Sequence, residues 1–177
     1  MGNFPNIDLI NIWIDKNAIL LAGAFNSEDR KYYQKGSEDI KFGELIIGDN
    51  VHVAPFSLIQ AHGGVSIGKN VTIASGSKIY SLSHHYKNLN DATDNKRYSF
   101  SSMALKEDQF LIVGNVTIGN NAAIGLNSIV LPGSKVPNGA WVAVSSVVNG
   151  NELINENSIF SSRNNIADSI ALTGGPA

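Results

Sequence analysis

The stretch that decides the fold runs from Ile112 to Val148 and reads IVGNVTIGNNAAIGLNSIVLPGSKVPNGAWVAVSSVV. An aliphatic residue recurs in it at every sixth position, and a small or β-branched residue follows four places after each of the first six. A period of six fits neither an α-helix nor an alternating strand, so the stretch predicts a repeat architecture. The aliphatic column is Ile112, Ile118, Ile124, Val130, Val136, Val142 and Val148, and the small column is Val116, Ala122, Ser128, Ser134, Ala140 and Ser146.

The same rhythm occurs earlier in the chain, where it slips once by two residues at Gly63-Gly64. Six residues suit one short, flat strand followed by a tight corner, and three such sides close a triangular turn of about eighteen residues. The aliphatic side chains then stack inside a prism, while Asn or Gly at the corners accepts a positive φ. The earlier aliphatic column is Ile47, Val53, Ile59, Ile67, Ile73 and Ile79.

Four motifs resemble those of the hexapeptide-repeat acyltransferases. They read IGNNAAIGLNS at 118–128, VLPGS at 130–134, AVSSVV at 143–148 and GGPA at 174–177, the last similar to the family's Gly-x-Pro-Ala after the final coil. The resemblance covers roughly residues 44–148 and that tail, and its closest type is the galactoside, maltose and polysaccharide O-acetyltransferases. It implies an all-β fold, the left-handed parallel β-helix, against the usual right-handed preference of parallel crossovers.

The length of 177 residues fits a single domain. We divide this domain into N-terminal coils with a polar loop at 1–43, hexapeptide repeats at 44–148 and a C-terminal tail at 149–177. Between Glu28 and Lys41 we expect a polar loop or a short helix. The repeats are interrupted at about 83–111, where charged and aromatic residues predict an extruded loop beside the functional site.

Charge and composition exclude several classes of function. Thirteen Lys and Arg against fifteen Asp and Glu leave a net charge of −2, which gives no reason to expect a nucleic-acid partner. The absence of Cys excludes disulfides, thiolate zinc sites and cysteine nucleophiles. The N-terminus lacks the pattern of a signal peptide, and Asn and Gly interrupt the uncharged stretch from Gln109 to Ser134. We therefore expect a cytoplasmic protein without an integral membrane segment.

Two adjacent histidines, His84 and His85, stand where the repeat stops and the insert begins. The resemblance implies that a histidine at this point is the catalytic base; His84 matches the family position best, and His85 is one place off. A neutral imidazole is suited to remove the proton of an attacking sugar hydroxyl near pH 7. A pair of polar residues at a loop entrance is the competing interpretation. Candidates to orient the imidazole are a backbone carbonyl and the carboxylates Asp91, Asp94 and Glu107.

Of the other two histidines, His62 is expected to be a structural or interface residue, and His52 a surface or interface residue. His62 lies at the slip in the period, where a bulge is common, and His52 lies at an outward position. Successive histidines are ten, twenty-two and one residues apart. This spacing differs from that of the zinc-binding histidines in carbonic anhydrases with the same fold, so we expect no metal ion.

The resemblance also implies an acyl donor, acetyl-CoA, in a groove between neighbouring prisms of a homotrimer. The donor would contact mainly backbone groups of the later coils, which by position are Gly125, Leu126, Ala143, Val144 and Ser145. Outer faces of Ala, Val and Ser would expose too much apolar surface in a monomer, which agrees with a threefold assembly. Arg163 and Lys135 are candidates to hold the nucleotide phosphate, and Trp141 is a candidate to cover the pantetheine.

These observations favour an acetyl-CoA-dependent acyltransferase that O-acetylates a sugar hydroxyl of a polysaccharide or glycoside by direct transfer. N-acetylation of an amino sugar or a nucleotide-linked sugar stays open, because an amine acceptor would use the same base. A non-catalytic trimeric β-helix scaffold is the alternative from another class of function. Release of free thiol from acetyl-CoA would separate both enzymes from the scaffold.

Overall fold

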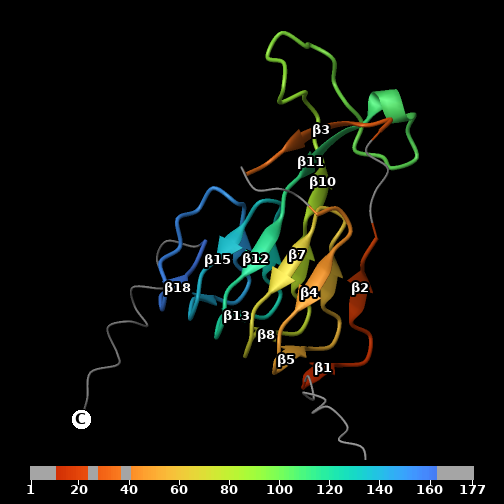
Figure 1. Cartoon of the computed structure of the whole chain (residues 1–177). Coiled ribbons are helices and arrows are strands. Elements are labelled where there is room, and N and C mark those ends of the chain that lie inside the picture. Colours follow the sequence, from red (N-terminus) through yellow and green to blue (C-terminus); the bar gives the residue numbers. More distant parts are fainter. Residues whose placement is uncertain (1–10, 24–27, 37–40, 163–177) are drawn as a thin grey trace, which may run out of the picture.

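The chain winds into a three-sided prism of short parallel strands, and one further sheet projects from the prism. Figure 1 shows this computed structural model, which describes residues 11–23, 28–36 and 41–162. In each complete turn the chain passes through a first, a second and a third sheet before the next turn begins. Strands from different turns lie side by side and pair in parallel, as predicted for stacked coils.

Each face of the prism is one of these sheets. The first sheet contains β1 (Ile12–Ile14), β5 (Val51–Val53), β8 (Thr72–Ile73), β13 (Ala123–Ile124), β16 (Trp141–Val142) and β18 (Ile159–Phe160). The second sheet contains β2 (Ile19–Leu21), β6 (Leu58–Gln60), β9 (Lys78–Tyr80), β14 (Ile129–Val130) and β17 (Val147–Val148). The third sheet contains β4 (Leu45–Ile47), β7 (Val65–Ile67), β12 (Val116–Ile118) and β15 (Lys135–Val136).

Side chains of the predicted aliphatic column fill the prism. In the second sheet Ile79, Val130 and Val148 stand in register, and each is at most 1% exposed. The small column also runs through the earlier turns, where it includes Ser57 and Ser77. Its serines are equally buried, and the hydroxyls of four of them donate to carbonyl oxygens of the next turn: Ser57, Ser77, Ser128 and Ser134. The hydroxyl of Ser77, for example, lies 2.8 Å from the carbonyl oxygen of Gly125. Burial of these hydroxyls is therefore compensated by hydrogen bonds, and both inward columns are confirmed at these positions.

Asparagines form a ladder along the corner between the third and first sheets. Asn50, Asn70 and Asn121 have φ of 57°, 56° and 57°, in the left-handed region that a tight corner requires. The side-chain amide of Asn50 donates to the oxygen of Asn70 over 3.1 Å, and that of Asn70 donates to Asn121 over 3.0 Å. The predicted positive φ at Asn corners is confirmed here, and the ladder links three consecutive turns.

The first residue assigned to the aliphatic column, Ile112, does not lie in the prism. It belongs to β11 (Phe110–Val113) and is half-buried, whereas its neighbours Leu111 and Val113 are fully buried. The prediction for Ile112 is wrong because β11 belongs to a separate sheet outside the three faces of the prism, so Ile112 does not point into the interior of the prism. Inside the prism the aliphatic column resumes at Ile118.

The prism extends further along the chain than the predicted boundary at 148. The sixfold step continues from Val148 to Ile154 and Phe160, and both of these side chains pack against the core. Residues 149–162 therefore continue the coil, and the prediction that the tail begins at 149 is wrong for them. The GGPA motif and Arg163 lie outside the described residues.

A fourth sheet projects from the corner between the second and third sheets. In it β10 (Leu82–His84) pairs antiparallel with β11, and β11 pairs parallel with β3 (Lys31–Gln34). Two excursions therefore meet, one leaving the prism after β2 and the other after β9. In Figure 1 the turns stack from β1 and β2 on the right to β18 on the left, and this sheet rises above them from the side of the prism. It carries the predicted extruded loop, which includes the short 3-10 helix η1 (Lys106–Asp108).

The strand β3 overturns part of the expectation for 28–41, where a polar loop or a short helix was predicted. Lys31–Gln34 is extended because it adds to the edge of β11, a partner almost eighty positions further along the chain. Four residues show too little alternation to reveal such a pairing. The correction matters for function, because it places an N-terminal segment against the insert.

The slip at Gly63 lies between the two excursions. A Cβ atom at Gly63 would overlap the carbonyl oxygen of Ser81 and would lie 2.7 Å from Cγ1 of Val113. A backbone oxygen cannot move away cheaply, so this corner accepts only glycine. The adjacent His62 lies 2.8 Å through Nδ1 from the carbonyl oxygen of Gly23. The slip thus lies at the corner from which the fourth sheet projects, in contact with the residues on either side of the second excursion.

Candidate functional site

The strand β10 places His84 at the base of the extruded loop. His84 pairs in register with Leu111, and Leu111 pairs with Tyr32, so the three side chains share one face of the fourth sheet. The His84 side chain is half-buried, and its Nε2 atom is buried without a hydrogen-bond partner among the described residues. An unpaired buried nitrogen costs about 1–3 kcal/mol, a cost that folded proteins rarely carry outside functional sites.

His85 follows as the first residue of the loop and is held differently. Its backbone N–H donates to the carbonyl oxygen of Phe110 over 2.8 Å. Its Nδ1 lies 2.9 Å from the carbonyl oxygen of Lys87, and its ring centroid lies 4.9 Å from that of Tyr86. The backbone N–H of Lys87 also lies 3.2 Å from this Nδ1. In the tautomer in which Nδ1 accepts that hydrogen bond, the proton lies on Nε2, which is then a donor. His85 is therefore oriented by the backbone and by an aromatic neighbour.

The three carboxylates considered as partners of the histidines are engaged elsewhere or lie apart. Asp94 accepts hydrogen bonds from Asn88 over 2.9 Å and from the Tyr98 hydroxyl over 2.7 Å. Asp91 accepts from the backbone and hydroxyl of Thr93. Within the described part of the chain, no hydrogen bond joins either of them, or Glu107, to His84 or His85. Of the candidates to orient an imidazole, only the backbone carbonyl is found.

Sequence reasoning did not detect the contribution of β3 to this region. Nζ of Lys31 donates to the hydroxyl of Tyr98 over 3.0 Å, and Tyr98 is only 2% exposed. Tyr98 also packs against Phe110, with ring centroids 5.5 Å apart. Its hydroxyl donates in turn to Asp94, so a chain of contacts links β3 to the middle of the insert. The insert is therefore built around a buried tyrosine and has a defined shape.

Asp94 is expected to stay ionised at unusually low pH. Hydrogen bonds from Asn88, then from Tyr98 and the Lys96 amide, lower its pKa from 3.8 to about 2. Because the folded pKa lies below the unfolded one, the carboxylate stabilises the insert above about pH 4, and this contribution is lost as the pH falls through about 2. A carbon-13 NMR titration should give a midpoint near 2 for wild-type Asp94, and Tyr98→Phe should move it upward. An unshifted wild-type midpoint would contradict this network.

The residues predicted to contact the acyl donor do lie together, on the corner between the first and second sheets. The Ser145 N–H donates to the Leu126 carbonyl oxygen over 2.8 Å, and a Cβ at Gly125 would lie 2.8 Å from the Val144 nitrogen. Leu126 is 47% and Val144 52% exposed, although both are apolar. Gly125 and the neighbouring Ala143 complete this corner.

The two predicted groups lie on different corners of the same prism. His84 and His85 stand at the corner between the second and third sheets, whereas Leu126 and Val144 stand at the corner between the first and second. The whole width of the second sheet separates them within one chain. Lys135 is the first residue of β15 on the third sheet, two residues after the turn at Pro132-Gly133.

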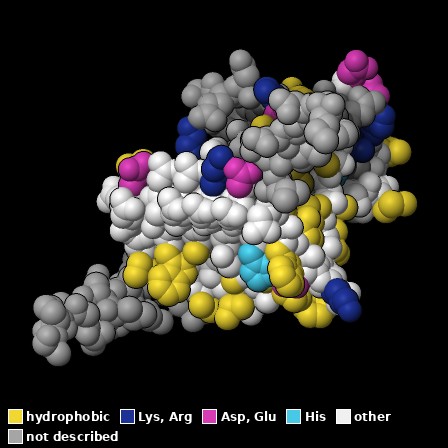
Figure 2. Space-filling model, turned by 60° about the horizontal axis from the view of Figure 1, so that its bottom comes forward, with side chains coloured by type: hydrophobic (Ala, Val, Ile, Leu, Met, Phe, Trp, Pro, Cys, Tyr) yellow, Lys and Arg dark blue, Asp and Glu magenta, His cyan; other side chains and the backbone are white. Residues whose placement is uncertain are grey.

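Aromatic side chains lie at two places on the outer face of the first sheet, separated by Thr72 and Ala123. Trp13 and His52 pair in register, and Asp15 accepts 2.8 Å hydrogen bonds from Trp13 Nε1 and from His52 Nε2. On the same sheet Trp141, 47% exposed, lies beside Ala123. Figure 2 shows hydrophobic side chains gathered beside a histidine on the underside of the prism. His52 is therefore a surface residue held by a carboxylate, as predicted.

The described residues contain no group of three His, Cys, Asp or Glu side chains placed to bind a metal ion. None of the helical structure found over the same residues has the length and apolar character needed to span a bilayer.

Two curated sequences from Escherichia coli are similar to the chain. One, named dTDP-4-amino-4,6-dideoxy-D-glucose acyltransferase, is 32% identical over 106 residues, which are 60% of this chain and 51% of that protein. The other, from strain K12, is named putative lipopolysaccharide biosynthesis O-acetyl transferase WbbJ and is 30% identical over 119 residues, which are 67% of this chain and 56% of that protein. The matched part thus spans about half the length of these curated relatives. No protein-family model matches the chain.

Solved structures share the fold. AntD, an N-acyltransferase from Bacillus cereus, superposes with a TM-score of 0.60 at 19% sequence identity, over 85% of this chain and 65% of that one. In this crystal structure an AntD mutant is in complex with dTDP-4-amino-4,6-dideoxyglucose and coenzyme A. The predicted resemblance to hexapeptide-repeat sugar acyltransferases and the left-handed parallel β-helix are confirmed.

Proposed function

We propose that the chain is an acyltransferase that moves an acetyl group from acetyl-CoA to a sugar hydroxyl, with His84 as the general base. One observation carries this proposal. The histidine that the resemblance singles out has a buried, unpaired ring nitrogen at the edge of a coil, beside a polar insert. The similarity to curated sugar acyltransferases supports the reaction class.

The chemistry moves one proton, from the acceptor hydroxyl by way of His84 to the leaving sulfur, and needs one good leaving group. His84 takes the proton of the acceptor hydroxyl while the oxygen bonds to the carbonyl carbon of the thioester. The carbon–sulfur bond then breaks, the thiolate leaves, and the imidazolium returns the proton to sulfur. No covalent acyl-enzyme is required, because the thiolate is already a good leaving group. His85 is positioned one residue away to donate to the developing oxyanion.

The corner formed by Leu126 and Val144 suits the donor. Its exposed apolar side chains fit the alkyl part of an acyl-pantetheine arm, which otherwise would face water. Gly125 allows the next turn to pack closely against this corner, because a Cβ atom there would collide with the backbone of that turn. We place acetyl-CoA along this corner.

In an assembly of three copies, the donor corner at Leu126 and Val144 of one chain could meet the corner at His84 of another. The outer face of the second sheet lies between them and presents a row in register in which one lysine interrupts four aliphatic residues: Ile19, Leu58, Lys78, Ile129 and Val147. Burying this row around a threefold axis removes apolar surface from water and seats the donor corner of one chain near the histidines of its neighbour. We therefore propose a homotrimer with one site at each subunit interface.

N-acylation is the second candidate reaction. It is favoured by the name of the first curated relative, an acyltransferase for an amino sugar, and by the description of AntD as an N-acyltransferase. The same base would serve, although an amine needs less help to lose its proton. A scaffold without catalysis is disfavoured, because neither His84 nor His85 is fully buried within the chain. We place the proposed reaction in polysaccharide biosynthesis and in the cytoplasm, where acetyl-CoA is available.

Thiol release tests the proposal. Purified protein with acetyl-CoA should release free thiol when a sugar acceptor is added, and a panel of neutral sugars, amino sugars and nucleotide-linked sugars would identify the acceptor group. Mass spectrometry of the product distinguishes an ester from an amide. Sedimentation equilibrium on the same sample should return the mass of three chains. No thiol release with any acceptor, together with no binding of acetyl-CoA by calorimetry, would refute the proposed acyltransferase activity.

A further inference from the structure

Phe56 has the wrong side chain for its place on the corner between the first and second sheets. In the first five turns this corner has a positive φ at one position in register, occupied by Asn17, Phe56, Gly76, Asn127 and Ser145. Four of these residues are small or polar, whereas Phe56 holds a bulky ring at φ of 61°. A bulky side chain in the left-handed region costs folding free energy, which Asn or Gly would spare. Stability therefore does not explain the ring.

The ring of Phe56 also has no packing role among the described residues. It is 67% exposed, lies outside the core cluster and pairs with no other aromatic ring in the described part of the chain. The turn is held by its backbone instead. The Ser57 N–H donates to the carbonyl oxygen of Ala54 over 3.4 Å, and Pro55 stands at the second position, which proline favours. An exposed ring on a strained backbone is typical of a side chain that contacts a ligand.

The proposed donor residues stand on the same corner, two and three turns further along the prism. We number the turns by their strand in the first sheet, so turn 2 begins with β5, turn 3 with β8, turn 4 with β13 and turn 5 with β16. Exposed apolar side chains stand on the corner in turn 2 (Phe56), turn 4 (Leu126) and turn 5 (Val144). The Gly76 N–H of turn 3 donates to the carbonyl oxygen of Pro55 over 3.1 Å, so turns 2 and 3 are adjacent here. The apolar column is thus interrupted at turn 3.

The interruption at turn 3 is polar. Its corner residues are Ser75 and Gly76, and a Cβ atom at Gly76 would overlap Oδ1 of Asn127. The side chain of Asn127, which is exposed, therefore leans from turn 4 over Gly76. A thioester carbonyl needs polar surroundings, and the groups on either side of it, an acyl chain and a pantetheine arm, are apolar where they begin. The order of side chains on this corner matches that order.

The proposed trimer places the thioester at the height of turn 3. The row that it buries runs along the prism, so the threefold axis is parallel to the prism, and rotation about this axis leaves the height of each turn unchanged. His84 stands four residues after the end of β9, the second strand of turn 3. The base of one chain therefore faces turn 3 of its neighbour. With the coenzyme arm over turns 4 and 5, the acyl chain is directed toward turn 2 and Phe56.

We propose that Phe56 is a specificity-determining residue, which limits the transferred acyl group to two carbons. Adjacent turns are about 4.8 Å apart. From a carbonyl carbon at turn 3, the methyl group of an acetyl reaches about 1.5 Å toward turn 2. The remaining distance of about 3.3 Å is close to the contact distance of two carbon atoms, so a further methylene would overlap the ring. This inference rests on the proposed acyl transfer and on the proposed trimer.

Thiol release with acetyl-, propionyl- and butyryl-CoA tests the limit. The wild type should use butyryl-CoA about 100-fold less well than acetyl-CoA, as judged by kcat/KM. Phe56→Asn should raise kcat/KM for butyryl-CoA by about 10- to 100-fold, the range expected when an overpacked contact is removed. The same variant should change kcat/KM for acetyl-CoA by less than about fivefold, because a methyl group makes few contacts with the ring. Phe56→Leu, with a smaller side chain, should gain propionyl-CoA more than butyryl-CoA.

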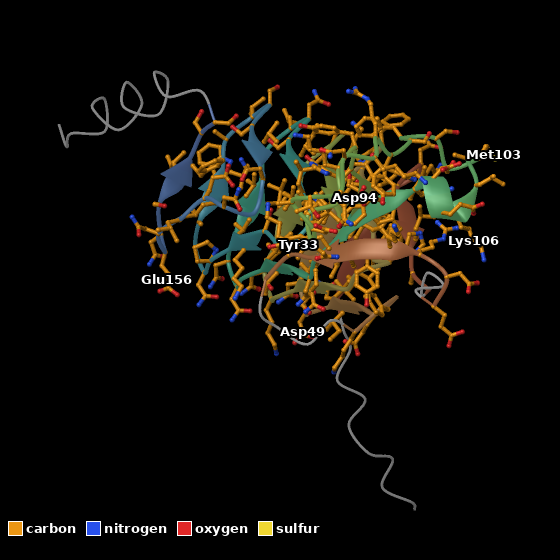
Figure 3. The ribbon with its side chains drawn as sticks, turned by 90° about the horizontal axis from the view of Figure 1, so that it is seen from above. Tyr33, Asp49, Asp94, Met103, Lys106 and Glu156 are labelled. Atoms are coloured by element: carbon orange, nitrogen blue, oxygen red, sulfur yellow. The ribbon has the colours of Figure 1, made fainter. Side chains whose placement is uncertain are left out.

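Asparagine is the suitable replacement because Asn17 and Asn127 already occupy this corner position, with φ of 65° and 55°. Phe56→Asn should therefore keep or raise the thermal midpoint of the protein, and a clear fall would make the ring structural and overturn the proposal. The matched control is Met103→Asn, which also removes an exposed apolar side chain. Met103 is 91% exposed, and Figure 3 shows it with Lys106 at the outer end of the insert. A gain of butyryl-CoA turnover in this control would likewise overturn the proposal.

Calorimetry with acetyl-CoA and butyryl-CoA separates this inference from the acyl transfer. If the wild type uses both donors equally, the acyltransferase stands and the limit is refuted. If Phe56→Asn raises KM for the acceptor and leaves the acyl preference unchanged, the ring contacts the acceptor and the limit is refuted as well. If no acceptor releases thiol, but the wild type binds acetyl-CoA more tightly than butyryl-CoA and Phe56→Asn removes the difference, the limit stands and the transfer is refuted. Binding of neither donor would refute both.

Discussion

Replacing His84 by alanine is expected to reduce acceptor-dependent thiol release by about 100- to 10,000-fold, the range that a positioned general base contributes. The reduction should fall on kcat, because the proton is in transfer only in the transition state. The hydroxyl of a sugar is a poor nucleophile until this proton leaves, and the described residues place no other unpaired buried ring nitrogen at the edge of a coil. Acetyl-CoA affinity should change little, since the proposed donor corner lies elsewhere.

The matched variant is His85→Ala. It removes the same imidazole one position later, where Nδ1 is held by the Lys87 carbonyl, and should lower kcat less than His84→Ala does. Both variants must keep the thermal midpoint and the sedimentation mass of the wild type for the comparison to count. A large loss in His85→Ala with near-normal turnover in His84→Ala would transfer the role of base to His85. Normal turnover in both would exclude a histidine base.

The second large effect is on stability. Ile124→Ala should lower the free energy of unfolding by about 2–5 kcal/mol, the usual cost of such a truncation in a close-packed core. Ile124 is 0% exposed and stands in register with Ile73 and Val142, the inward residues of the adjacent turns. The turns are stacked on one another by their backbone ladders, so they cannot collapse into the space left by the truncated side chain.

Ile112→Ala makes the same chemical change at a position with the same place in the six-residue pattern. Because Ile112 is half-buried in the fourth sheet, this variant should cost markedly less than Ile124→Ala. Urea denaturation at one fixed protein concentration measures both, since subunit association would otherwise shift the midpoints. Equal costs would mean that Ile112 lies inside the prism, as the period alone predicts.

The coils could be predicted because their causes are local. Each side of the prism repeats the same requirements within six residues: an aliphatic side chain inside, a small one near the corner, and a residue tolerant of positive φ at the bend. Asn70 and Asn121 show the last requirement at separate turns, and both have the predicted backbone. His84 stands at the point where the pattern stops, and the family resemblance there predicts it as the base; this role stays a prediction.

Other features depended on contacts between distant parts of the chain. Lys31 and the rest of β3 meet β11 only because two excursions leave the prism at the same corner. Neither the pairing nor the link from Lys31 to Tyr98 leaves a local pattern. The side on which Ile112 lies was missed for the same reason. The contacts that Lys87 and Arg97 each make with the Tyr86 ring depend on a loop of irregular backbone that packs around buried Tyr98.

By itself, then, the sequence determined the stacked turns, the identity of their inward residues and the position at which an insert leaves the prism. These properties repeat along the chain, so each copy reinforces the pattern. The tertiary structure alone decided what the inserts build: a fourth sheet from two distant segments, and a cavity lined by both cationic and anionic side chains of the insert. Non-local pairing costs loop entropy that is recovered only when the partner strand is already in place, so no short stretch of sequence specifies it.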